Sequence, residues 1–175
     1  MAAAPSFTTR YSFEGASPEV HEDASVARES TLVGDVTVAA DASIWPGARL
    51  RGDIGPVSVG EESHVGENAT LHASTVGDRV MVGNGAVIND STVEDGALVG
   101  FNAVVDESTV GEGSVVASGA VVTPGTTIPP ESFVYGSPAS VRPLSETTID
   151  TDRLFERYHS GEYANLANRH EDLFE

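Results

Sequence analysis

Five polar residues near the middle of the chain have side chains that can take part in catalysis or metal binding. They are His64, Glu67, His72, Asn84 and Asn89. An imidazole binds metal ions and transfers protons near neutral pH, and a carboxylate can act as an acid or a base. An asparagine amide offers a neutral oxygen, which suits hard cations and is a weak ligand for zinc. The chain has no cysteine, so thiolate catalysis, disulfides and cysteine-based zinc sites are excluded.

A repeat in the sequence predicts the elements that hold these residues. A hydrophobic residue recurs every six positions over most of the chain, and a small residue recurs four positions later. The steps group in threes, and one step of each group is five residues long instead of six. One position of the group therefore recurs every 17 residues, at Val59, Val76, Val93 and Val110. Six is not a helical period. The pattern predicts an all-β parallel solenoid, in which each coil has three short strands and pairs with the next coil at about 4.8 Å.

This solenoid determines which candidate residues lie together. His72 and Asn89 are 17 residues apart, so they are expected to stack on neighbouring coils, outside the core, about 4.8 Å apart. Asn84 follows a different strand and faces another direction, where it would meet the edge of a neighbouring subunit. His64 lies on the same face as Asn84. A simpler interpretation of the two asparagines is a ladder of amide hydrogen bonds along the coils, which is common in stacked parallel strands.

The chain divides into an irregular segment over residues 1–19, the solenoid over 20–144 and a helical segment over 145–175. Between Leu50 and Val59 the solenoid has about three residues more than a plain coil, which predicts an outward loop.

The helical segment is predicted to pack on the outside of the solenoid. Asp150 or Thr151 can cap a helix that continues to Tyr158. Gly161 interrupts this helix, and hydrophobic spacing over residues 163–170 predicts a second amphipathic stretch.

Charge and composition limit the setting of the protein. The 27 acidic residues exceed the 9 basic ones, all of which are arginine, and the net charge is −18. This charge repels the phosphates of nucleic acids, so no nucleic-acid partner is expected. The lack of lysine and the acidic surface favour adaptation to high salt, where the Debye length is a few Å. The sequence has no apolar run long enough for a membrane span or for a secretory signal. We therefore expect a protein of a halophile's cytoplasm.

The sequence resembles the γ-class carbonic anhydrase family. Residues 43–53 read SIWPGARLRGD, residues 122–125 read VTPG and residues 135–139 read YGSPA, and acyltransferases of the same fold share the last motif. The resemblance implies a left-handed β-helix, a hand that spacing alone does not give. It also implies a homotrimer with one zinc at each subunit interface, held by two histidines of one chain and one of its neighbour.

The resemblance places the three zinc positions at His72, Asn84 and Asn89, so only one of three histidines is retained. Gly66 stands where the family has a glutamine that orients the attacking water, and Glu67 keeps an acid at a candidate catalytic position.

Arg51 and Asp53 also match residues of the family, which typically form an ion pair across the trimer interface.

Three functions remain open. The first is a trimeric binding or structural protein with a degenerate zinc site that lacks efficient hydration of carbon dioxide. The second is a zinc enzyme with an altered site, in which His64 and Glu67 meet a neighbour's His72, because two histidines and a carboxylate form a known zinc set. The third is an acyl-CoA transferase, although no lysine or broad basic patch is available for the CoA phosphates. Zinc is the cofactor in the second function and is absent in the first.

Overall fold

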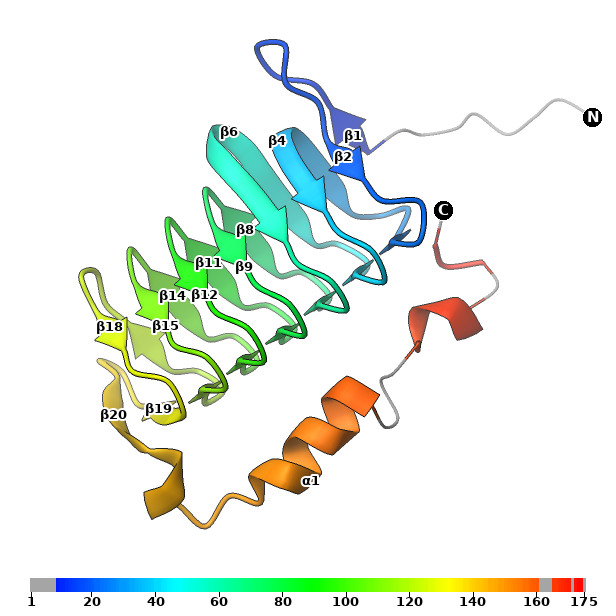
Figure 1. Ribbon diagram of the computed structural model, residues 1–175. Coiled ribbons are helices and arrows are strands. Elements are labelled where there is room, and N and C mark those ends of the chain that lie inside the picture. The colour runs from blue at the N-terminus through cyan, green and yellow to red at the C-terminus, as the bar shows by residue number, and fades with distance from the viewer. Residues whose placement is uncertain (1–8, 161–164, 171, 175) are drawn as a thin grey trace, which may run out of the picture.

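The protein forms a left-handed parallel β-solenoid of about 7 turns, as the repeat and the resemblance predicted (Figure 1). It is seen in a computed structural model that describes residues 9–160, 165–170 and 172–174. Figure 1 shows the coils stacked in one row, with the C-terminal segment along the outside of the stack.

Short strands make up the solenoid, and a few helical turns follow it. The strands are β1 Arg10–Tyr11, β2 Glu19–Val20, β3 Ser25–Val26, β4 Thr31–Val38, β5 Ser43–Ile44, β6 Arg49–Val59, β7 His64–Val65, β8 Thr70–His72, β9 Thr75–Val76, β10 Met81–Val82, β11 Val87–Asn89, β12 Thr92–Val93, β13 Leu98–Val99, β14 Val104–Asp106, β15 Thr109–Val110, β16 Val115–Val116, β17 Val121–Val122, β18 Thr127–Ile128, β19 Ser132–Tyr135 and β20 Ser140–Pro143. The helical elements are the 3-10 turn η1 Leu144–Glu146, the α-helix α1 Thr151–Phe155, the π-helical turn η2 Glu156–Ser160 and the 3-10 turn η3 Ala167–Arg169.

The strands form three flat faces. We call the row β5, β7, β10, β13 and β16 the helix face, the row β8, β11, β14 and β17 the ladder face, and the row β9, β12, β15 and β18 the threonine face. Strands β4 and β6 are long enough to belong to both the ladder face and the threonine face. The register confirms the predicted 17-residue coil, because Val59 pairs with Val76 and Val65 pairs with Val82.

The predicted insertion lies inside β6. Gly34 of β4 pairs with Gly52, and Val36 pairs with Val57, so one residue of β4 faces four residues of β6. The strand thus carries three extra residues as a bulge instead of the separate loop that the sequence suggested. Ile54 at this bulge is 80% exposed.

Hydrophobic side chains fill the inside of the solenoid. Leu50, Leu71, Ile88, Val105 and Val122 form one stacked row, and each is fully buried. A row of this kind gains burial only when several coils stack, which explains why one coil would not be stable alone.

Buried serines occupy one corner of the solenoid. The hydroxyl of Ser74 donates to the carbonyl oxygen of His72 and accepts from the backbone N–H of Ser91, one coil further on. Ser91 and Ser108 repeat this arrangement. The hydroxyl groups thus pair with backbone groups that the tight turn would leave unsatisfied.

The ends of the solenoid differ in detail from the sequence prediction. The strand β1, inside the segment expected to be irregular, pairs with β4. At the other end, β20 pairs antiparallel with β19 and closes the helix-face sheet.

The C-terminal segment follows the outside of the solenoid. Asp150 caps α1, because its carboxylate accepts a 3.0 Å hydrogen bond from the backbone N–H of Arg153. Of the second amphipathic stretch predicted over residues 163–170, the described part contains the three-residue turn η3. Gly161 and Tyr163 lie outside the described residues. The chain then returns to the first coils, where Phe174 forms a bridge with Ala27. No helix among the described residues is long and apolar enough to cross a membrane.

Candidate functional site

Four polar residues form a row across the ladder face. Arg51, His72, Asn89 and Asp106 are paired in register on β6, β8, β11 and β14. Each follows a buried hydrophobic residue of its strand, so its side chain points out of the solenoid. The predicted stacking of His72 and Asn89 on neighbouring coils is therefore confirmed. The sequence analysis missed Asp106, although its 17-residue spacing from Asn89 was a usable signal.

Hydrogen bonds join these side chains into a chain. The amide nitrogen of Asn89 donates to Oδ1 of Asp106 at 2.8 Å. The amide oxygen of Asn89 therefore faces Nδ1 of His72, at 2.9 Å. Because this oxygen can only accept, Nδ1 of His72 carries the hydrogen and donates it. Both polar atoms of Asn89 are thus engaged inside the row.

Asp53 lies at the other end of this row. Its Oδ2 accepts a hydrogen bond from Nη2 of Arg51 at 2.8 Å, within the same chain. The two residues are two positions apart on β6, so their side chains lie on the same side of the strand. Pairing of Arg51 and Asp53 across a subunit contact, which the sequence analysis expected, stays a prediction. The hydrogen bond from Arg51 is the main reason that the pKa of Asp53 is below its ordinary value.

Two buried atoms face each other between Asp53 and His72. Nε2 of His72 lies 3.5 Å from Oδ1 of Asp53, and neither atom has a hydrogen-bond partner among the described residues. The side chains are mostly buried, with 26% of His72 and 18% of Asp53 exposed. Arg51, Asp53, His72, Asn89 and Asp106 therefore form one continuous polar row, which we call the ladder.

The ladder does not have the ligands of a three-histidine zinc site. It contains one imidazole, and the oxygen of Asn89 already accepts from His72. Asn84 is on a different side of the same chain, at the edge of the helix face. No group of three or more histidine, aspartate or glutamate side chains arranged for a metal occurs among the described residues. The residues present therefore do not fit this zinc site.

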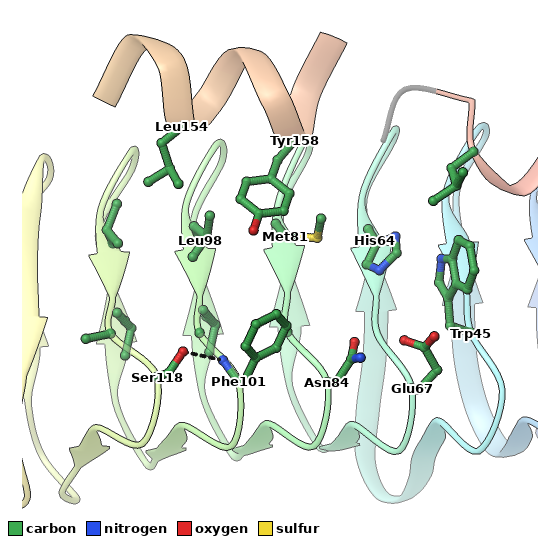
Figure 2. A pocket seen from close by; sticks show the side chains of 17 residues that line it. Trp45, His64, Glu67, Met81, Asn84, Leu98, Phe101, Ser118, Leu154 and Tyr158 are labelled. Carbon is green, nitrogen blue, oxygen red and sulfur yellow. Dashed lines mark hydrogen bonds between the residues drawn. The ribbon is translucent and has the colours of Figure 1, made fainter. Parts of the chain in front are cut away.

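A cavity on the helix face brings together the other candidate residues (Figure 2). His64, Glu67 and Asn84 line a cavity of about 430 Å³ between the sheet and the C-terminal segment. The ladder residues are not among the residues that line it. One chain thus places its five candidate residues in two separate groups.

His64 is packed inside its own chain. Its ring lies 5.0 Å from the ring of Trp45, and its Nδ1 is 3.3 Å from the hydroxyl oxygen of Ser43. The Trp45 indole N–H donates to the same oxygen at 3.0 Å. His170 and Phe174 contact the other side of Trp45. This packing disfavours the altered zinc site, in which His64 would reach a neighbour's His72.

Burial lowers the pKa of His64 to about 4 from an ordinary value of 6.5. Between these two pH values the unfolded chain binds a proton at His64 that the native chain does not bind. The free energy of unfolding therefore falls as pH drops from 6.5 to about 4. For a pKa shift of this size the fall is about 3 kcal/mol.

The replacement His64→Met should remove this part of the pH dependence. Methionine is the residue paired with His64 on the next coil, at Met81, so its size and polarity suit this face. Chemical denaturation of both proteins at several pH values measures the difference. We expect their free energies of unfolding to diverge as pH falls from about 6.5 to about 4, with the variant losing less. Parallel pH profiles would contradict a neutral His64 packed against Trp45.

The chain folds as a left-handed β-helix built from hexapeptide repeats. A family model described as the hexapeptide repeat of succinyl-transferase matches residues 56–90 and 92–124. The sequence is similar to γ-class carbonic anhydrases and to related transferases, which supports the resemblance seen in its motifs.

Three relatives illustrate this similarity. A carbonic anhydrase of Geobacillus kaustophilus is 33% identical over 64 residues, which are 37% of this chain and 35% of the relative. The mitochondrial γ-carbonic anhydrase-like protein 1 of Arabidopsis thaliana is 46% identical over 57 residues, which are 33% of this chain and 23% of the relative. The chain thus matches about a third or less of the length of these curated relatives.

The third relative is a hexapeptide transferase family protein from Anaplasma phagocytophilum, whose crystal structure matches this fold with 27% sequence identity and a TM-score of 0.84. The match covers 93% of this chain and 98% of that one.

Proposed function

We propose that the protein is a γ-carbonic-anhydrase-like trimer subunit that lacks a three-histidine zinc site and does not hydrate carbon dioxide efficiently. In this proposal, the hydrogen bonds of the ladder occupy the side chains that would otherwise bind the metal on this face. The observation that carries the proposal is the double engagement of Asn89, whose oxygen accepts from His72 and whose nitrogen donates to Asp106. A zinc ion would have to compete with both hydrogen bonds for a ligand that binds it weakly.

Hydration of carbon dioxide requires a bound water whose pKa is lowered to about 7, which zinc supplies in such enzymes. The ladder offers a single imidazole for this purpose. Glu67 keeps an acid at the candidate catalytic position, but it lines the cavity on the helix face and is not part of the ladder. A binding or structural role therefore fits these residues better than catalysis of hydration.

The ladder face supports the proposed assembly. Beside the polar row runs an outward row of Val87, Val104 and Val121, paired in register, and Val87 is 37% exposed in the single chain. A flat face with an apolar row gains by being covered, and one repeated contact can close into a threefold ring. Proteins with hexapeptide-repeat β-helices are usually trimers. Such a contact would leave Arg51 and Asp53 near the subunit boundary.

The acyl-CoA transferase alternative has support from the transferase relatives but less from the surfaces of this chain. No arginine is among the described residues that line the cavity on the helix face, and the chain has no lysine. The phosphates of CoA would therefore meet no cation among these lining residues.

Two measurements on the unmodified protein test the proposal. Sedimentation equilibrium in molar KCl should give three times the chain mass. Stopped-flow assays with added zinc should give a rate of carbon dioxide hydration equal to that of zinc in buffer. A monomer would contradict the assembly, and a rate far above the buffer rate would contradict the loss of hydratase activity.

A further inference from the structure

The outward side chains of the helix face are unlike those of the other exposed face. On the threonine face the outward row contains Thr75, Thr92 and Thr109. On the helix face the equivalent row contains Met81, Leu98 and Val115. Met81 and Val115 are only 6% and 5% exposed. The sequence therefore provides an apolar surface on this face, and the C-terminal segment covers it.

This cover leaves a cavity that is large enough for a small molecule. Met81 and Leu98 lie on the sheet side of the cavity, and Leu154 and Tyr158 of the C-terminal segment lie opposite (Figure 2). Val115, paired with Leu98 on the next coil, also lines the cavity, and we call Met81, Leu98 and Val115 its floor. Its volume of about 430 Å³ is within the range of ligand sites, which are mostly apolar with a few polar groups.

The charges that line the cavity select among possible ligands. Among the described residues that line it there is no lysine or arginine, and Glu67 is the one acid. Burial keeps His64 neutral above a pH of about 4, so it does not oppose a cation at neutral pH. Glu67 forms no ion pair with any residue that the structure describes. An anionic ligand would meet a carboxylate without a cation, whereas a cationic ligand would meet its counter-ion.

Aromatic rings add to this preference. Trp45, Phe101 and Tyr158 line the cavity, and the faces of such rings attract ammonium groups. Phe101 is 50% exposed, and Asn84 beside it is also exposed, so the cavity opens at this side. The net charge of −18 raises the local concentration of cations around the whole protein.

We propose that this cavity binds a small organic cation, an ammonium group that carries a short aryl or alkyl body. The ammonium group lies at the carboxylate of Glu67, and the body lies on the floor of Met81, Leu98 and Val115. None of the ladder residues is among the residues that line this site.

Calorimetric titration of the full chain with three matched probes tests this proposal. The probes are phenethylammonium, the neutral 2-phenylethanol and the anionic phenylacetate. We expect phenethylammonium to bind most tightly and phenylacetate not to bind. The variant Glu67→Gln should weaken binding of phenethylammonium about tenfold, the size of effect expected when one partly buried charge pair is lost. It should leave binding of 2-phenylethanol unchanged.

The matched control is Glu62→Gln, which removes the same charge from an exposed position that does not line the cavity. It should leave the affinity for phenethylammonium unchanged. Circular dichroism confirms that each variant is folded. A second variant, Leu98→Phe, enlarges a floor residue and should weaken both phenethylammonium and 2-phenylethanol.

Three results would overturn the proposal. They are equal affinity for the cation and the anion, an unchanged affinity in Glu67→Gln, and no binding of phenethylammonium at concentrations up to about 10 mM, which corresponds to a binding free energy weaker than about 3 kcal/mol.

Discussion

Replacing Asn84 and Asn89 together with histidine is expected to produce a protein that binds about one zinc ion per chain, because three imidazoles are a sufficient protein ligand set. His72 and the new residue 89 lie on neighbouring coils of one chain, one strand spacing apart. The new residue 84 lies on another side of the chain, so the third imidazole has to come from a neighbouring subunit. Zinc binding should therefore depend on the trimer.

The expected stabilisation is large. A ligand that binds only the native trimer adds about 4 kcal/mol when its free concentration is a thousand times its dissociation constant. Differential scanning calorimetry with and without zinc measures this gain. The single variants Asn84→His and Asn89→His are matched controls, each with two imidazoles per site, and should gain much less. An equal gain in either single variant would contradict the proposed ligand set.

Hydratase activity should return only in part in the double variant. Gly66 stands at the position of the glutamine that orients the attacking water in the family that the sequence resembles. A Cβ atom at Gly66 would lie 2.9 Å from the backbone nitrogen of Asn84 and from the carbonyl oxygen of Val82. This space cannot accept a side chain unless the backbone moves, so replacing Gly66 with glutamine is not a simple repair.

Stability is expected to rise steeply with salt. Acidic residues occur one per coil at one corner, at Glu61, Asp78, Asp95 and Glu112, each 17 residues after the one before. Oδ1 of Asp78 accepts from the backbone N–H of Glu61 at 2.8 Å, and Oδ1 of Asp95 accepts from that of Asp78 at 2.9 Å. The carboxylates of Asp78 and Asp95 are therefore held one coil apart, a spacing of about 5 Å, as a pair of like charges.

Salt weakens this repulsion, because the Debye length falls from about 10 Å at 0.1 M to about 3 Å at 1 M. We expect the melting temperature to rise by about 10 °C or more between these concentrations of KCl, which corresponds to about 4 kcal/mol in a chain of this size.

The variant Asp78→Asn is the matched control, since asparagine keeps the accepting oxygen and loses the charge. It should stabilise the protein by up to about 1 kcal/mol in dilute buffer and by little in molar salt. A flat salt profile would contradict adaptation to a salt-rich cytoplasm.

The solenoid could be predicted closely because its signal is repeated many times. Each coil places an aliphatic residue at the same position, so spacing was enough to predict the 17-residue register. The same spacing predicted the three extra residues between Leu50 and Val59. The C-terminal segment is present once, and hydrophobic spacing over residues 163–170 had no second copy to test it. The predicted helix there is a three-residue turn in the described part.

The candidate site was only partly predictable. Spacing placed His72 beside Asn89 and separated both from Asn84, and the expected amide hydrogen bonds are present at Asn89. The sequence analysis did not predict that Arg51 pairs with Asp53 within one chain, although their i, i+2 spacing on one strand was a usable signal. It also did not reveal the cavity, which exists only where the C-terminal segment crosses the helix face.

The zinc affinity of the unmodified protein tests the loss of the metal site most directly. Purified protein in molar KCl is titrated with zinc in a calorimeter, and its metal content is measured by mass spectrometry after dialysis. With one imidazole per site and Asn89 engaged by His72 and Asp106, we predict well below one zinc per chain and no tight binding. One tightly bound zinc per chain would contradict this account.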